Sequence, residues 1–243
     1  MDTLLPLWIT VFFAGFVQGL TGFGSVLISL PILAVFLPFK TLIPLISLFA
    51  LCINIVLMFQ LYRSIPTQKL IPLLIGTAPG IYAGVHLLTT FPEHILEICL
   101  GIIISGFAAY SLVGKEITLQ NNSPLIPTGA GFLAGCLGGS IGANGPPIII
   151  YSTVLKGDRH IMKSLMCGYF FFAGIGISSM HGYKGLLTED VMQYFYQGLP
   201  ALGGGILLGT VIYKMIGETT YRKSVMLLIL CLGIFMLKQG FAH

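Results

Sequence analysis

Charged residues are scarce in this chain. Of its 243 residues, 12 are Lys or Arg and 8 are Asp or Glu, so charged side chains make up 8% of the sequence, against about 25% in an ordinary soluble domain. Hydrophobic residues make up 56%, and the mean hydropathy is +0.95. This composition cannot cover a water-facing surface, and it therefore indicates an integral membrane protein.

Carboxylates are missing from the middle of every apolar segment. The acids all stand near segment ends: Asp2, Glu93, Glu97, Glu116, Asp158, Glu189, Asp190 and Glu218. A carboxylate at the membrane midplane would suggest a proton relay, so a carboxylate-based proton antiporter is not expected. Coupling through His86 or His181 stays open, and the absence of acids suits a path for anions.

Metal and cofactor motifs are also missing. The five cysteines are isolated within apolar segments, so we interpret them as packing residues and not as disulfides or metal ligands. The string GAGFLAG (129–135) resembles a dinucleotide fingerprint, but it lacks the strand–helix–strand context and the later acid. We expect no cofactor, no metal and no nucleic-acid partner.

Ten apolar segments follow one another with short connections, which predicts an all-α membrane protein of the cell (inner) membrane. They lie at 4–22, 23–38, 41–62, 70–89, 93–113, 124–139, 140–155, 159–181, 190–213 and 222–238. The N-terminus, MDTLLPLW, has no positive region and no cleavage site before the hydrophobic run, so we expect it to be part of the first membrane segment and not a signal peptide.

Two uncharged regions have lengths that fit neither one crossing nor two. The region 4–37 has 34 residues and the region 124–155 has 32, which would give single helices of about 50 Å. Each has its glycines near the middle. We therefore predict a pair of short, broken or re-entrant helices in each region, covered by protein or by a water-filled cavity.

The two halves of the chain resemble each other. A shift of 116 places GFVQGLTGFGSVLISLPIL (15–33) on GFLAGCLGGSIGANGPPII (131–149), and a shift of 121 places YRSIPTQ (62–68) on YKGLLTE (183–189). We therefore predict two repeats, 1–118 and 119–243, which together form one transmembrane domain.

The positive charges predict the orientation of these repeats. If each glycine-rich pair returns to the side from which it came, nine Lys and Arg residues gather on one face and three on the other. The richer face is then cytoplasmic, both termini lie on the non-cytoplasmic side, and the second half is inverted relative to the first. Inverted repeats are typical of secondary transporters.

The stretch GSIGANGPPIII (139–150) predicts a helix that begins inside the membrane. Proline suits the first turn of a helix and Asn its N-cap, so we expect a half-helix that starts at Pro146 and Pro147. A helix N-terminus with free N–H groups is an anion site that needs no Lys or Arg. The expected substrate-binding residues here are Gly139, Ser140, Gly142, Asn144 and Gly145.

The first half has a corresponding stretch before Pro31. We expect Pro31 to start a second half-helix that faces the first across the repeat axis. Gln18 stands one turn before the glycine cluster and is also expected to face the site. The further substrate-binding candidates are Gly22, Gly24 and Ser25.

Three features have simpler interpretations. Glycines four residues apart often serve close helix packing, and we favour this for Gly76/Gly80/Gly84 and Gly205/Gly209. Asn54 is central in its segment, where hydrogen bonding between helices and lining of a pore are both open. GGSIG (138–142) fits the nucleophile elbow of hydrolases, but no strand precedes it and no buried acid is present.

The paired strings GFVQGLTGFGSVLISLP (15–31) and GFLAGCLGGSIGANGPP (131–147) resemble the glycine-rich signatures of the TauE/SafE sulfite exporter family of membrane permeases. KGDRHIMKSL (156–165) is similar to the family segment after the second signature, whereas the first signature lacks Asn-Gly-Pro-Pro. The resemblance implies transport of small sulfur-containing anions such as sulfite, thiosulfate or sulfonates.

The sequence therefore predicts a secondary-type transporter and not an enzyme. A small anion would bind between the two glycine-rich turns, and rocking of one repeat against the other would give alternating access. An anion channel, an intramembrane serine hydrolase with Ser140 as nucleophile, and a purely structural subunit are the alternatives. The expected partners are the anion, the lipid bilayer and, as an open possibility, further copies of the chain.

Overall fold

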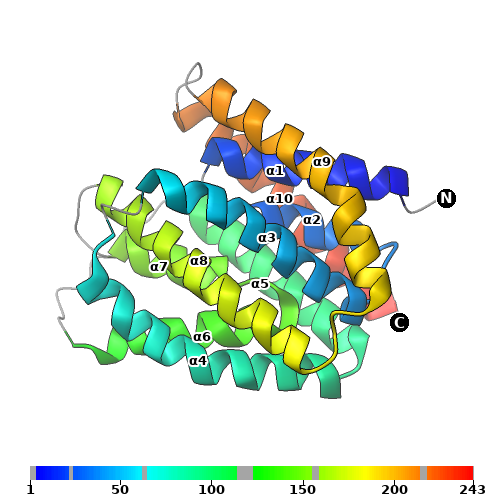
Figure 1. Cartoon of the computed structure of the whole chain (residues 1–243), viewed down its shortest axis with the longest axis horizontal. Coiled ribbons are helices and arrows are strands. Elements are labelled where there is room, and N and C mark those ends of the chain that lie inside the picture. The colour runs from blue at the N-terminus through cyan, green and yellow to red at the C-terminus, as the bar shows by residue number, and fades with distance from the viewer. Residues whose placement is uncertain are drawn as a thin grey trace.

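The protein is a bundle of α-helices whose two termini lie at the same end (Figure 1). A computed structural model describes residues 4–21, 24–61, 65–113, 123–154, 159–213 and 218–242. These ranges form ten helices: α1 Leu4–Thr21, α2 Ser25–Leu33, α3 Phe39–Leu61, α4 Thr67–Thr90, α5 Glu93–Val113, α6 Leu125–Ile141, α7 Gly145–Val154, α8 Arg159–Tyr183, α9 Glu189–Tyr213 and α10 Glu218–Ala242. The all-α prediction is confirmed, and each helix lies mainly within one predicted segment.

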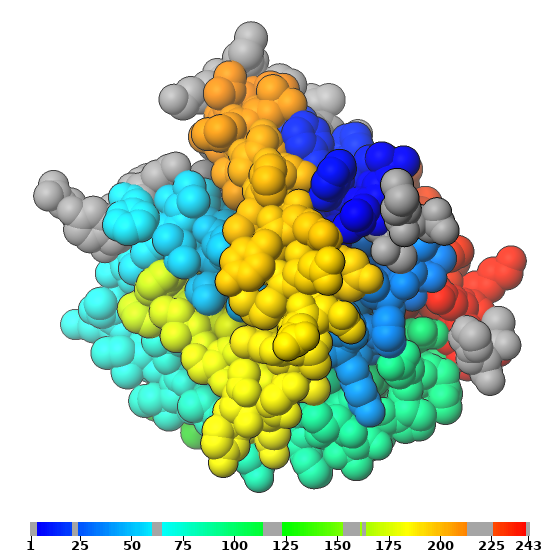
Figure 2. Space-filling model, turned by 45° about the vertical axis from the view of Figure 1, so that its right-hand side comes forward, coloured from blue at the N-terminus to red at the C-terminus, as the bar shows by residue number. Residues whose placement is uncertain are grey.

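Five helices are long and apolar enough to cross a membrane. They are α3, α4, α5, α8 and α9, and α1, α6 and α10 contain shorter apolar stretches. The outside of the bundle is apolar as well: Phe59 is 79% exposed, Leu125 78% and Leu207 70%. Figure 2 shows one such face, where α9 lies across the molecule beside α1. A surface of this kind belongs in hydrocarbon.

Each of the two long uncharged regions forms a pair of helices with a break between them. At 1.5 Å per residue, α1 is about 27 Å long and α2 about 14 Å, and α6 and α7 have about 26 and 15 Å. The breaks use Gly24, with φ 98°, and Gly142, with φ 70°. These left-handed conformations are open to glycine at little cost, so the prediction of broken helices is confirmed.

The prediction that Pro31 starts a half-helix is wrong. The helix α2 already begins at Ser25, and Pro31 stands inside it. The left-handed Gly24 is the N-cap of α2 and directly precedes Ser25, so the helix starts there. Pro31 acts near the other end, because its missing N–H removes a bond to the carbonyl of Leu27, and α2 stops two residues later at Leu33.

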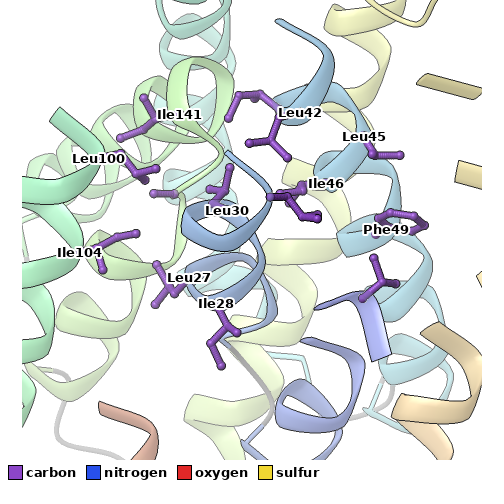
Figure 3. Close-up of a cluster of buried hydrophobic side chains, with 14 of the residues drawn as sticks. Leu27, Ile28, Leu30, Leu42, Leu45, Ile46, Phe49, Leu100, Ile104 and Ile141 are labelled. Carbon is purple, nitrogen blue, oxygen red and sulfur yellow. The ribbon is translucent and has the colours of Figure 1, made fainter. Parts of the chain in front are cut away.

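The short helix α2 is buried in the bundle core. Its residues Leu27, Ile28 and Leu30 are at most 3% exposed. They pack among buried side chains of α3, α5 and α6, as Figure 3 shows: Leu42, Leu45, Ile46, Phe49, Leu100, Ile104 and Ile141. A helix that ends inside the membrane is tolerated only when protein covers it, and this apolar shell covers α2.

Two helix pairs at opposite edges of the bundle are held in close contact by glycine (Figure 1). In the pair α4/α6, a Cβ on Gly76 would lie 1.9 Å from the carbonyl oxygen of Thr128, and one on Gly131 would lie 2.0 Å from that of Leu73. In the pair α1/α9, Gly15 faces Leu202 and Gly205 faces Phe12 in the same way. The packing interpretation of Gly76/Gly80/Gly84 and Gly205/Gly209 is confirmed, and Gly15 and Gly131 have the same role.

This close contact predicts opposite effects of two neighbouring substitutions. Alanine in a helix is favoured over glycine by about 1 kcal/mol, and a Cβ at Gly129 would meet nothing within 4 Å. Gly129→Ala should therefore keep or raise the thermal stability of the detergent-solubilised protein. Gly131→Ala, on the same helix, should lower it, because α4 and α6 are forced apart. Equal melting temperatures for the two variants would contradict the packing.

Candidate functional site

A cavity of about 50 Å³ lies where the two helix breaks meet. It is lined by the end of α1 and the start of α2, the end of α6 and the start of α7, and the middle of α3 and α8. Its polar lining residues are Gln18, Ser25, Ser47, Asn54 and Asn144, and its larger apolar ones are Leu27, Ile46, Ile149, Phe170 and Ile177. None of the described lining residues carries a charge.

Three of the polar side chains form a directed chain of hydrogen bonds. The Ser25 hydroxyl donates to Gln18 Oε1, and Gln18 Nε2 donates to Asn54 Oδ1 over 3.3 Å. All three residues are at most 5% exposed. Because the two amide oxygens accept bonds within the chain, the remaining N–H groups of Gln18 and Asn54 are left as donors.

Asn144 reaches the cavity from the other side. It directly precedes α7, which begins at Gly145, so Pro146 and Pro147 stand in the first turn as expected. Within the described residues its side chain makes no hydrogen bond. A Cβ on Gly138 would lie 2.9 Å from the Cβ of Asn144, so glycine at position 138 leaves the room that Asn144 occupies.

The turn between α6 and α7 supplies fewer free N–H groups than the sequence suggested. The N–H of Gly142 donates to the carbonyl of Gly138 over 3.2 Å, and that of Ala143 to the carbonyl of Leu137 over 3.1 Å. These bonds cap the end of α6. Gly142 therefore shapes the cavity wall, and the donors of this turn begin with the N–H groups of Asn144 and Gly145.

Some of the expected site residues line the cavity and others do not. The cavity brings together Gln18, Gly24, Ser25, Gly142, Asn144 and Gly145. Gly22 lies outside the described residues. Ser140 and Gly139 do not line the cavity: the Ser140 hydroxyl donates to the carbonyl of Cys136 over 2.7 Å, and Gly139 packs against α4.

Part of the site was not predicted from the sequence. Asn54 was left between two interpretations, and Ser47 and Phe170 were not considered. Ser47, Ala50 and Asn54 all line the cavity and are spaced three and four residues apart on α3. This spacing places small and polar residues on one helix face. It is the sequence pattern that could have identified these residues as part of the site.

His181 stands behind the cavity wall. It is fully buried, at 0% exposure, in the last turns of α8. Its Nδ1 lies 3.2 Å from the Ser47 hydroxyl and its Nε2 lies 3.3 Å from the carbonyl oxygen of Gly139. These bonds do not include Ser140, so within the described residues Ser140 has no histidine base of the kind that a hydrolase nucleophile needs.

The comparison with protein families agrees with this site. Residues 7–236 match the model of the family described as Sulfite exporter TauE/SafE. The chain belongs to the TauE/SafE family. It is therefore a multi-pass membrane transporter and not an enzyme, and it has a small transported substrate. No curated protein and no solved structure matches the chain.

Asn54 ends the hydrogen-bonded chain and lines the cavity, so its role in transport can be tested. A hydrogen bond to a charged substrate would contribute about 1.5–3 kcal/mol, and for such a substrate Asn54→Ala should reduce transport by at least roughly tenfold. Flux through reconstituted liposomes measures this. Ser140→Ala is the matched control and should transport normally, because its hydroxyl is bonded within α6. A defect in Ser140→Ala with normal Asn54→Ala would reverse the assignment.

Proposed function

We propose that this chain is a secondary transporter that moves a small anion, a sulfur oxyanion or an organosulfonate, by alternating access. The observation that carries the proposal is the meeting of two helix N-termini, those of α2 and α7, at one uncharged cavity. Each helix N-terminus contributes about half a positive charge. Their convergence favours a negative ligand without a Lys or Arg.

The polar groups of the cavity support an anion. Gln18 and Asn54 present amide N–H groups, and Asn144 adds an amide that makes no hydrogen bond to the described residues, next to the N–H of Gly145. We assign the binding role to these residues and to Ser25. The proposal leaves out Ser140 and Gly139, and Gly142 contributes the shape of the turn.

The apolar part of the cavity bears on the choice of anion. Phe170, Ile149 and Ile177 line it together with the amide groups. A site with donors and apolar walls accommodates an anion that carries a carbon skeleton, such as a sulfoalkanoate. This supports organosulfonates alongside sulfite and thiosulfate.

We further propose that the ten helices form two inverted repeats. The helix contacts support this, because they keep their pattern when each helix is exchanged for the one five places away. The exchange converts the pair α1/α9 into α6/α4, α3/α9 into α8/α4 and α2/α10 into α7/α5, while α3/α8 and α5/α10 convert into themselves. A twofold relation between the halves predicts this pattern.

The proposed topology places both termini on the non-cytoplasmic side of the cell membrane. The starts of α1 and α3 and the end of α8 lie at one end of the bundle (Figure 1), which agrees with a hairpin that returns to its own side. Several of the residues that set the charge difference, Arg63, Lys115, Lys156 and Lys214 among them, lie outside the described residues.

Thiol labelling tests this orientation. In a background without the five native cysteines, Lys184→Cys and Gln68→Cys place exposed thiols at opposite ends of the bundle. An impermeant maleimide should label Lys184→Cys in intact cells and Gln68→Cys only after permeabilisation. The reverse pattern would invert the topology, and labelling of both in intact cells would contradict the membrane placement.

Anion flux in proteoliposomes tests the function. Sulfite, thiosulfate, sulfate, a sulfoalkanoate and lactate are compared, each for wild type, Asn144→Ala and the control Ser140→Ala. We expect saturable flux of a sulfur anion. This flux should fall at least roughly tenfold in Asn144→Ala and remain normal in Ser140→Ala.

The other outcomes separate the alternatives. Flux of lactate alone keeps the transporter and removes the sulfur assignment. Flux that does not saturate indicates a channel. Absence of flux for every anion, with folded protein present, contradicts the proposed substrate class. Normal flux in folded Asn144→Ala removes the central residue of the proposed site.

A further inference from the structure

The buried histidine next to the cavity has no role in the anion site as described so far. We propose that His181 is the proton-binding residue of this transporter, so that one proton travels with each anion. The inference rests on the proposed anion transport and names its coupling ion. It comes from the hydrogen bonds of His181 to Ser47, which lines the cavity, and to Gly139, three residues before the turn that shapes it.

The two partners of His181 define its hydrogens. The carbonyl oxygen of Gly139 can only accept, so Nε2 carries a hydrogen. The Ser47 hydroxyl lies within reach of two acceptors, His181 Nδ1 at 3.2 Å and the carbonyl oxygen of Pro44 at 2.7 Å. A hydroxyl has one hydrogen and can give it to only one of them at a time.

Two states of the site follow. In the neutral state, Ser47 donates to Nδ1. In the protonated state, Nδ1 has its own hydrogen and donates to the Ser47 oxygen, while Ser47 donates to Pro44. Every polar atom keeps a partner in both states. The site therefore accepts a proton by turning one hydroxyl, without breaking the packing around it.

The anion and the proton favour each other. A charged imidazole that is fully buried costs free energy unless an opposite charge lies nearby. An anion in the cavity is such a charge, and it is separated from His181 by the Ser47 side chain. Since coupling between two ligands is reciprocal, a proton on His181 strengthens anion binding, and a bound anion strengthens proton binding.

Other titratable groups on the elements near His181 are mostly exposed. On the helices packed against this end of α8 they are Lys40 of α3 and Tyr82 and His86 of α4, followed by Tyr183 and Lys184 in the chain, and all of these are exposed. Cys136 of α6 is partly buried one turn before Gly139. None of them lines the cavity, so His181 is the titratable group with a described link to it.

One proton and one anion cross the membrane together in each transport cycle. His181 Nδ1 takes up one proton from the side to which the cavity is open, and it releases this proton with the anion on the other side. With a monoanion the pair carries no net charge. With one proton for each anion, a difference of one pH unit drives roughly tenfold accumulation.

Proteoliposomes with the membrane potential clamped at zero test the coupling. The probe is radiolabelled thiosulfate, or the sulfoalkanoate if that is the anion carried, because both are fully ionised near neutral pH. Wild type should accumulate the probe when the outside is more acidic, and an inward anion gradient should acidify the lumen, read with a trapped pH dye. His181→Gln should still exchange labelled for unlabelled anion but should not accumulate it. His86→Gln, an exposed histidine, should behave as wild type.

The outcomes distinguish the inference from the proposed function. If wild type exchanges no anion, the proposed function fails and the inference fails with it. If wild type exchanges anions but neither accumulates them under a pH gradient nor moves protons, the inference alone is overturned, whether or not His181→Gln folds. Proton-driven accumulation that persists in folded His181→Gln overturns the role of His181.

Discussion

The structure depends on one constraint: polar groups of the backbone that lie inside a membrane must find partners within the protein. The helices α2 and α7 begin in the interior of the bundle, and the ends of these helices cannot be left to lipid. Seven of the nine residues of α2 are buried, and the C-terminal end of α6 is closed by the bonds of Gly142 and Ala143. The residues that start α2 and α7, Ser25 and Gly145, line the cavity. The cost of breaking a helix inside the membrane and the proposed binding of an anion would therefore have the same origin.

Glycine makes this arrangement possible in two separate ways. At Gly24 and Gly142 it permits the left-handed turn that ends one helix and starts another. At Gly76 and Gly131, and at their counterparts in α1 and α9, it lets two backbones touch. These close contacts hold the broken helix pairs in place, because each of α1 and α6 packs along a full-length helix.

The helices could be predicted from the sequence, but the site could be predicted only in part. Hydropathy defines the ten segments because lipid leaves few alternatives to a helix, and uncharged runs of the wrong length reveal the breaks. The direction of single side chains was harder to predict. Pro31 was misplaced because a proline in an apolar run is compatible with the start or the interior of a helix, and Gly24 decided between them. Ser140 turned back onto its own helix, and the rotation of α3 that brings Asn54 inward is set by its neighbours.

The lack of charge among the described residues that line the cavity suits transport. A buried Lys would need a permanent partner, and an ion pair buried in this way has a large desolvation cost. It would also hold an anion too firmly for release. Amide groups and helix ends provide a weaker attraction that exists before and after the substrate passes. A histidine that is charged only when protonated would add attraction for the loaded state alone.

The helix pairing also bears on how the transporter moves. Each glycine pair joins one helix from each half, so α1 with α9 and α4 with α6 are better candidates for rigid bodies than the halves themselves. The cavity then lies between two groups of helices that each contain helices from both halves. Gln18, Ser25 and Asn54 belong to the group with α1 and α9, and Asn144 belongs to the group with α4 and α6. An anion that binds all of them holds the groups together. The contact of His181 with Ser47 joins α8 to α3, which is the interface between the two groups. A proton at this position therefore acts on the same interface as the anion, and this shared interface is the physical basis for coupling one to the other.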